Sequence, residues 1–306
     1  MREADVGWIV FGLLVGGLVA VLAVVITGAG QSSRAGVMMR LGSFKIRFGL
    51  KTCLIASTLL CVFLGLVVNR AQRQKRTVQA LGDLGCHVFY DSQERPYGCT
   101  FTFYEDSREV RFIKPGVLVS LLGEDCFRHA IEVFARRPLD DAHVELLSNL
   151  SSLKCVHLDD CRITNAGLAH LSGLRHLQVL SLSRTKIDDS GMKHLKYLKE
   201  LAGLSLQGTA VGDEGVKQLG DLRQLKLLVL SRTLVSDNGL RYLSQMTCLD
   251  NVIVLGLSGT RITDESAGVI KKLQKLTYLD LTETLMTAGC IDEIRVSLPL
   301  ASVYPN

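Results

Sequence analysis

The stretch that decides the fold is residues 177–224, LQVLSLSRTKIDDSGMKHLKYLKE followed directly by LAGLSLQGTAVGDEGVKQLGDLRQ. The second half repeats the first. Leucine occupies the first, fourth and sixth positions, threonine the ninth, an aliphatic residue the eleventh and aspartate the thirteenth. A fixed period of this length indicates an array of units that bury their apolar faces only against their neighbours. We therefore expect a solenoid.

The same pattern extends well beyond this stretch. Its first positions are Leu153, Leu177, Leu201, Leu225, Val252 and Leu276, and it fades at Leu300. The spacing is 24 residues except for one spacing of 27, between residues 225 and 252. The three extra residues leave two registers open for the fifth strand, Leu249/Val252/Val254 and Val252/Leu255/Leu257. A weaker first unit begins with an expected strand at Ile131–Ala135.

Each residue type that recurs at the same position of the unit has a structural reason. Alternating leucines should point inward from a short strand, and the threonine should hydrogen-bond inside the following turn. Asp or Asn should then open a short helix as its N-cap, at Asn165, Asp189, Asp213, Asp237 and Asp264. The expected fold class is α/β, a leucine-rich-repeat solenoid over residues 131–306. Parallel strands line its concave face and short helices its convex face.

Two apolar stretches precede the repeats. Residues 6–30 carry no charge, and residues 52–69 form a second uncharged run. At about 1.5 Å per residue, both approach or exceed the roughly 30 Å hydrocarbon core of a bilayer. The mean hydropathy of the chain, +0.25, is high for a soluble protein. We therefore expect one or two transmembrane helices and an integral membrane localisation.

Basic residues flank these stretches. Residues 1–76 contain ten Lys and Arg against Glu3 and Asp5, whereas the remainder contains 25 basic and 28 acidic residues. This distribution is typical of topology signals and lipid headgroups, and it argues against a nucleic-acid partner. The segments on both sides of the second stretch are basic, so the side of the membrane on which the repeats lie stays open. A start at Met38 or Met39, leaving one anchor, would remove that conflict.

The expected organisation has five parts. These are a possible first transmembrane segment at 1–30, a basic loop at 31–51, a transmembrane anchor at 52–69, a juxtamembrane helix and capping region at 70–130, and the repeat domain at 131–306. Within the fourth part we expect a helix ended by Gly85 and strands at His87–Tyr90 and Thr100–Tyr104.

The repeat with Thr or Cys in its turn and an Ile-Thr-Asp-x-Gly-Leu core resembles the cysteine-containing class of leucine-rich repeats. The layout of basic flank, apolar anchor, Arg-rich helix and HVFYD followed by LLGEDCF resembles that of bacterial membrane-anchored leucine-rich-repeat proteins, over roughly residues 45–306. The chain departs from that pattern at Cys86, where the family usually has Gly, and in its first apolar segment. The resemblance implies an interaction module without catalytic residues.

No catalytic or metal-binding motif is present in the sequence. The nine cysteines form no C-x-x-C pair and have no histidine at zinc spacing, so we expect buried thiols. The densest polar cluster is His157, Asp159, Asp160 and Cys161. Its cysteine should face inward while His157 and Asp159 face the concave surface, so a Cys–His couple is not expected. We therefore expect no enzyme activity and no cofactor.

The concave face and one rim are the candidate binding surfaces. Strand alternation places small, neutral or apolar residues on the concave face, including Val179, Ser181, Ser205, Leu227, Val229 and Tyr278. The rim carries Arg162, Arg184, Lys186, Arg232 and Arg261. Leu227 and Val229 are unusual for a merely solvated face.

The sequence favours a noncatalytic, membrane-tethered scaffold that binds a protein or peptide ligand through its concave face. A structural spacer in the cell envelope is the first alternative. A membrane sensor or enzyme with an unrecognised site is the second.

Overall fold

The structure, a computed structural model, describes residues 36–41, 44–90, 130–245 and 251–304. The expected first transmembrane segment at 1–30 and the expected strand Thr100–Tyr104 lie outside the described residues. The chain divides into two compact units, residues 1–73 with 114–127 and residues 74–113 with 128–306. They are described separately.

The first unit contains a hairpin where we expected only a basic loop, at 31–51. Strand β1 (Gly36–Leu41) pairs antiparallel with β2 (Phe44–Gly49), from Gly36 opposite Gly49 to Leu41 opposite Phe44. Both strands carry β-branched, aromatic or long apolar residues at alternate positions, which suit a pleated backbone. The basic side chains hid this pattern in the sequence.

Helix α2 (Leu50–Asp83) contains the whole of the apolar run 52–69 and continues through the expected juxtamembrane helix. It stops where the sequence predicted, because Gly85 takes a φ of +83° that glycine tolerates best. Within the described part of the chain, no helix is both long enough and apolar enough to cross a membrane. The side chains at 50–57, 60, 61 and 64 lie outside the described residues.

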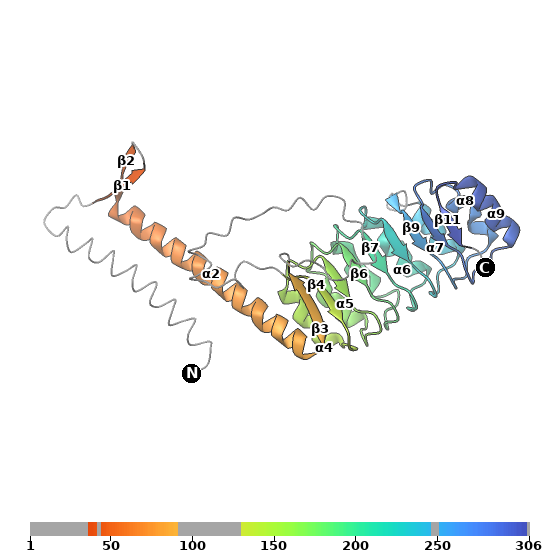
Figure 1. Ribbon diagram of the computed structural model, residues 1–306, viewed down its shortest axis with the longest axis horizontal. Helices are drawn as coiled ribbons and strands as arrows, with labels where there is room; N and C mark the ends of the chain where they lie inside the picture. Colours follow the sequence, from red (N-terminus) through yellow and green to blue (C-terminus); the bar gives the residue numbers. More distant parts are fainter. Residues whose placement is uncertain (1–35, 42–43, 91–129, 246–250, 305–306) are drawn as a thin grey trace. The chain divides into compact units, whose positions relative to one another are not determined.

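The second unit is built on one nine-stranded sheet (Figure 1). Strand β3 (Cys86–Tyr90) lies antiparallel to β4 (Ala130–Ala135), and the strands from β4 to β11 are parallel. The repeat strands are β5 (Cys155–His157), β6 (Val179–Ser181), β7 (Gly203–Ser205), β8 (Leu227–Val229), β9 (Val254–Gly256), β10 (Tyr278–Asp280) and β11 (Ser302–Tyr304). Val254 pairs with Leu227, so the fifth strand takes the later register and the extra residues precede β9.

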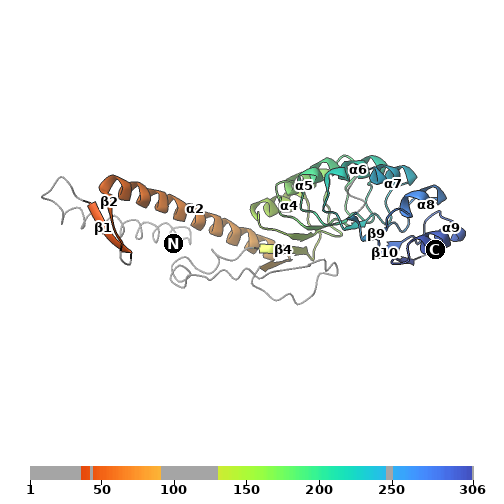
Figure 2. The same cartoon turned by 90° about the horizontal axis from the view of Figure 1, so that it is seen from above.

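Short helices cover the opposite face of the unit (Figure 2). They are α4 (Asp141–Glu145), η2 (Leu146–Asn149), α5 (Asn165–Leu171), η3 (Met192–Tyr197), α6 (Asp213–Lys217), η4 (Gln218–Asp221), α7 (Asp237–Ser244), η6 (Asp264–Ser266), α8 (Ala267–Ile270) and α9 (Ala288–Ser297). At the start of the array, Leu81 of α2 is fully buried in the same core, and β3 covers the edge of β4.

The core lies between sheet and helices and follows the predicted phase. In one representative unit, Leu201, Leu204 and Leu206 are all fully buried. Each contributes roughly 1.5–3 kcal/mol by leaving water. The expected threonine hydrogen bond inside the turn is confirmed: the Thr209 hydroxyl donates to the Leu206 carbonyl oxygen at 2.6 Å. The same bond forms at Thr185, Thr233, Thr260 and Thr284.

The expected helix caps are wrong: at four of the five positions the N-cap is the preceding residue, and at Asp189 the helix begins later, with Gly191 as N-cap. Helix α7 is capped by Ser236, whose hydroxyl accepts from the Asn238 amide, and Asp237 is already helical. The preceding Asp213 accepts from the Ser236 amide at 2.8 Å and from its hydroxyl at 2.6 Å. The aspartates therefore bind the next repeat, because their longer side chains reach across to it. Equivalent pairs are Asp141 with Thr164, Asp189 with Gly212, Asp237 with Thr263 and Asp264 with Thr287.

The hydrogen bonds from the aspartate of one repeat to the next repeat are here called the acidic clamp. This clamp explains why glycine stands two residues after the aspartate in the repeat. A Cβ on Gly239 would lie 2.5 Å from Asp213 Oδ1, closer than real atoms approach. Gly167, Gly191 and Gly215 face the same conflict with the acid or amide of the preceding repeat. The glycine therefore makes room for the neighbour's side chain.

Candidate functional site: the concave face

The concave face holds a hollow of about 810 Å³ that extends from Asp159, just after β5, across strands β6 to β10. Its lining is polar at the end nearer β5. The end nearer β10, here called the apolar end, contains most of the apolar side chains together with Ser258 and Asp280. The hollow is lined by Asp159, Ser181, Ser183, Arg184, Ser205, Gln207, Leu227, Val229, Ser231, Arg232, Val254, Gly256, Ser258, Tyr278 and Asp280. All six residues predicted for the concave face except Val179 line this hollow.

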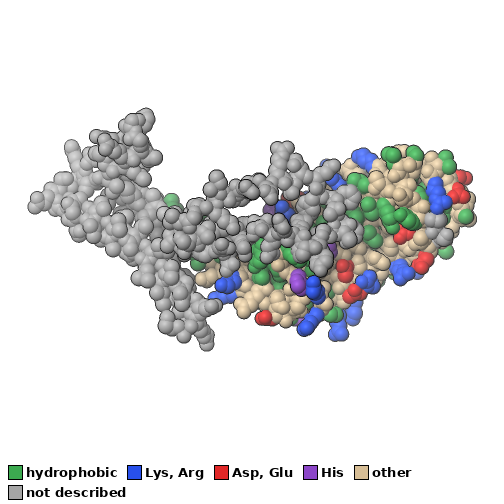
Figure 3. Space-filling model, in the orientation of Figure 1, with side chains coloured by type: hydrophobic (Ala, Val, Ile, Leu, Met, Phe, Trp, Pro, Cys, Tyr) green, Lys and Arg blue, Asp and Glu red, His purple; other side chains and the backbone are tan. Residues whose placement is uncertain are grey.

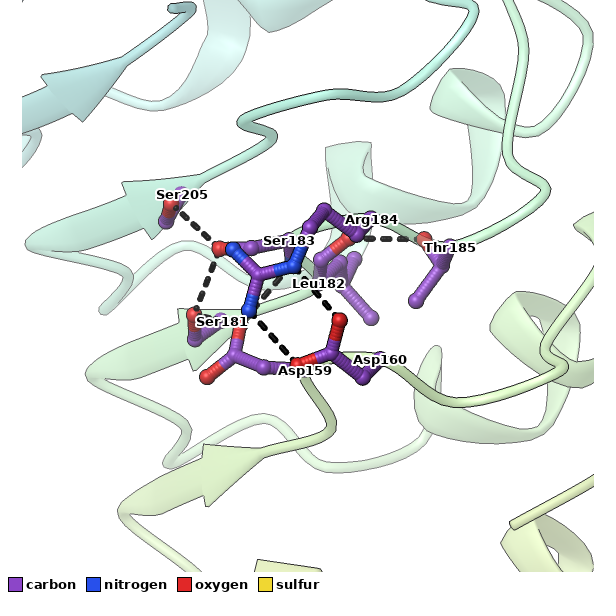
Figure 4. A network of polar contacts seen from close by, with 8 residues as sticks. All are labelled: Asp159, Asp160, Ser181, Leu182, Ser183, Arg184, Thr185 and Ser205. Carbon is purple, nitrogen blue, oxygen red and sulfur yellow. Dashed lines mark hydrogen bonds and ion pairs between the residues drawn. The ribbon is translucent and has the colours of Figure 1, made fainter. Parts of the chain in front are cut away.

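Asp159 organises the polar end (Figure 4). Its Oδ1 accepts from the Ser181 hydroxyl at 2.5 Å and from the Ser183 amide at 2.9 Å. The Ser183 and Ser205 hydroxyl oxygens lie 3.0 Å apart and share a hydrogen bond. Because these short side chains are hydrogen-bonded to one another, their hydroxyl groups are held in place at the bottom of the hollow. The sequence had marked Ser181 and Ser205 but not Asp159 as the group that orders them.

The apolar end is formed by Val229, Val254 and Tyr278. Val229 and Val254 are half-buried, and Tyr278 is 38% exposed. The Tyr278 ring packs against that of Tyr304 with 5.0 Å between the ring centres. These side chains offer a partner a shaped apolar wall, to which β11 contributes through Tyr304.

One predicted contact residue is less accessible than expected. Leu227 was expected to be an exposed apolar residue, but it is only 3% exposed. It lies in register with Gly203 on one side and Val254 on the other. On a concave sheet the side chains of neighbouring strands converge, so a side chain between two strands is covered more than alternation along its own strand predicts. Val179 is half-buried, and Ser181 and Ser205 are almost fully buried.

The predicted basic rim is two columns, not one stripe. Arg184 and Arg232 follow their strand leucines by two residues, whereas Arg162, Lys186 and Arg261 follow theirs by four. The second column is exposed, and it also contains Leu234 and Leu285 at 47% and 67% exposure. The prediction of one stripe is wrong, because these two positions of the turn point in different directions.

The first column takes the left-handed backbone conformation at every repeat. Its members are Asp160, Arg184, Gly208, Arg232, Gly259 and Glu283, with φ between 55° and 68°. A charged residue there costs roughly 1–2 kcal/mol relative to glycine. The glycines at the same phase were the signal in the sequence, but the charged residues between them concealed it.

Both arginines of this column form ion pairs. Arg184 binds Asp160 through two hydrogen bonds of 2.5 and 2.6 Å, and the guanidinium holds the pKa of Asp160 below its ordinary value. Arg232 reaches across Gly259 to Glu283 at 3.4 Å. Basic and acidic side chains are interspersed on the coloured part of the face shown in Figure 3.

At the β4 end of the face, His157 is packed rather than open. It is 7% exposed, and its ring stacks on Phe134 with 4.0 Å between centres. Its Nε2 lies 3.7 Å from Oε1 of the buried Glu132. His157 was expected to face the concave surface freely, and the aromatic stack is the reason it does not.

Among the described residues, the other histidines and the thiols show no reactive arrangement. His170 and His176 are exposed, and His194 is half-buried. Cys161 points inward, as expected, where it accepts a hydrogen bond from the Leu139 amide. Burial raises the pKa of Cys161 and raises that of Cys86 to about 11, so both stay thiols near neutral pH. The described residues contain no group of three or more side chains that could hold a metal ion.

Comparison with known proteins agrees with this architecture. A family model described as leucine-rich repeat matches residues 149–172 and 173–199. No curated protein matches the chain. Among solved structures, internalin C2 from Listeria monocytogenes is similar at 18% identity, over 58% of this chain and 81% of that one, with a TM-score of 0.47. Internalin F from the same organism is similar at 20% identity, over 53% of this chain and 56% of that one, with a TM-score of 0.36.

The matched segment contains two full repeats, and the strands continue in the same register on both sides of it. The phase of buried leucines and turn threonines is also unchanged from one unit to the next. The second unit of this chain is therefore a leucine-rich-repeat solenoid.

Proposed function

We propose that this chain is a noncatalytic, membrane-tethered scaffold that binds a segment of another protein in its concave face. The observation that supports this most is the hollow of about 810 Å³ with one hydroxyl-rich end and one apolar end. A hollow that combines an apolar wall with a few fixed polar groups is typical of ligand-binding surfaces. A surface that serves only as a spacer has no need of either.

The dimensions of the hollow suit an extended peptide. It extends over five strand spacings, from Asp159 after β5 to Asp280 in β10, and neighbouring strands lie about 4.8 Å apart, so it is about 24 Å long. An extended chain rises about 3.3 Å per residue, so about seven residues fit along it. One apolar side chain of the peptide would pack against Val229 and Tyr278. The backbone or polar side chains of the peptide would bind the hydroxyl groups beside Asp159.

The proposed tether is supported by an apolar face on α2. Leu59, Val62, Phe63 and Leu66 are 61–65% exposed. Their spacing places them on one face of the helix. Each would gain roughly 1.5–3 kcal/mol by leaving water. We infer that this face contacts the apolar interior of a bilayer, and that basic residues such as Arg70 and Arg73 lie at its headgroups.

A crosslinking experiment tests the binding site in the full chain. A photoreactive amino acid at Tyr278 should capture the ligand in native membranes. Val229→Glu places a charge in the apolar end and should abolish that capture. Val296→Glu, on α9, is the matched control, because Val296 is 84% exposed and lies outside the hollow. Both variants should melt at the wild-type temperature.

Equal capture by the two variants would show that the concave face is not the binding site, and the spacer interpretation would then be favoured. The tether is tested separately. The full chain should stay with membranes after a high-salt wash, because salt weakens headgroup attraction but does not extract an inserted helix. Release by salt alone would contradict insertion.

A further inference from the structure

The two edges of the solenoid differ in charge. One edge contains the later part of each convex helix, such as η3 and η4, and the segment that leads from it to the next strand. The other edge contains the segments that lead from a strand to the next helix. In the two central repeats, the helix-to-strand segments 193–202 and 217–226 contain six basic and two acidic residues. The strand-to-helix segments 183–191 and 207–215 contain two basic and four acidic residues. The domain therefore has one basic and one acidic edge.

The acids of the acidic edge have a structural role within the fold. Both carboxylate oxygens of Asp213 accept hydrogen bonds from Ser236, and Asp189 accepts one from the Gly212 amide. These acids hold neighbouring repeats together.

Several cations on the described part of the basic edge form no ion pair. Within the described part of the chain, Lys193, Lys196 and Arg223 form no ion pair, while Lys199 pairs with Asp221 at 3.4 Å and Lys217 with Glu214 at 3.4 Å. Burial and the charges of Lys193 and Lys196 together lower the pKa of His194, so the local potential is positive.

A hollow of about 620 Å³ opens on this edge between η3, η4 and the end of α7. Lys193, Lys196 and Lys217 line it together with Gln218, Gly220, Gln245 and one acid, Asp221, which is paired with Lys199. Tyr197 stands beside the hollow at 53% exposure, with the Lys196 ammonium 4.9 Å from its ring centre. An exposed tyrosine among lysines is typical of the boundary between lipid headgroups and acyl chains.

We propose that the basic edge of the solenoid docks on an anionic lipid surface through Lys193, Lys196 and Lys217, with Tyr197 at the headgroup level. This rests on the tether of the proposed function, which would hold the domain near headgroups. Lysine prevails over arginine here, which suits diffuse attraction to many phosphates better than bidentate recognition of one. In the two central repeats the edge presents one exposed tyrosine and no row of aromatic rings for stacking bases, which disfavours a single-stranded nucleic acid.

The experiment uses the full chain in lipid nanodiscs, where both sides of the bilayer are accessible. One set contains phosphatidylcholine only, and the other adds phosphatidylglycerol. Brief acetylation followed by mass spectrometry measures the reactivity of each lysine. We expect Lys193, Lys196 and Lys217 to react about fivefold more slowly in the anionic discs, the factor expected for one cation at a charged surface. High salt should remove this protection.

Lys186, exposed on the strand-to-helix edge, is the internal control and should react equally in both sets. Replacing Lys193, Lys196 and Lys217 by Gln should also remove the protection of Lys199. The matched control replaces Arg162, Lys186 and Arg261 by Gln and should leave it intact.

Equal reactivity of the three lysines in neutral and anionic discs would overturn the proposal. Protection by polyglutamate or duplex DNA without protection by anionic lipid would overturn it in favour of an acidic protein or a nucleic acid. Retention of the chain in neutral discs reports insertion of α2 independently. A failed tether and a failed lipid-docking edge are therefore distinguishable.

Discussion

Removing the Asp213 carboxylate should break the connection between two repeats at one defined place. In Asp213→Ala, the half-buried Ser236 amide loses the acceptor that now lies 2.8 Å away, and the Ser236 hydroxyl loses its partner at 2.6 Å. A donor left without an acceptor in such surroundings costs about 1–3 kcal/mol. We expect about 2 kcal/mol of local stability to be lost. Asp213→Asn should cost less, since its amide oxygen still accepts one bond.

Hydrogen exchange of the full chain in detergent is the assay, because repeat arrays do not always unfold in one step. A loss of about 2 kcal/mol corresponds to about 30-fold faster exchange in the peptide that contains Ser236. Glu214→Ala is the control: it removes the neighbouring acid from the same helix, but its only described ion pair is a surface contact with Lys217 at 3.4 Å. If both alanine variants exchange at the same rate around residue 236, the carboxylate acts only through its charge, and our account of the clamp is wrong.

Three further outcomes are expected. Thr209→Val should cost about 1 kcal/mol, because a buried hydroxyl bond to Leu206 is lost, whereas Thr277→Val at an exposed site should be nearly neutral in the same urea titration. Leu204→Asp should cost more than about 4 kcal/mol, because it buries a charge, and a folded, unshifted urea transition would refute the register. Arg184→Gln should raise the pKa of Asp160, measured by NMR; the stabilisation from this pair should be complete above the ordinary pKa of 3.8 and lost as pH falls through the lowered value.

The repeat phase was predictable because identical constraints act at every unit. A residue such as Leu204 meets its equivalents in the units on both sides, so a wrong phase would fail many times over. The turn threonines were predictable for the same reason. Periodicity in the sequence therefore determined the strands, the core and the position of the concave face.

Accessibility within that face was not predictable. Alternation along a strand gives the direction of a side chain, but exposure depends on what stands on the neighbouring strands. Leu227 is buried between the neighbouring strands β7 and β9, and His157 is buried because Phe134 covers it. The same limit applies to the rim, where Arg184 is held by an acid one repeat earlier in the chain.

The clamp between repeats has a direction, and this affects how such a chain can change its length. Every unit supplies an acceptor to its successor and a donor to its predecessor, so a duplicated unit fits between any two others without a new kind of contact. Unequal recombination can therefore lengthen or shorten the gene by whole units at little structural cost. An insertion shorter than a whole unit is tolerated where the hydrogen bonds of the clamp still form. Those between Asp237 and Thr263 form across the spacing with three extra residues.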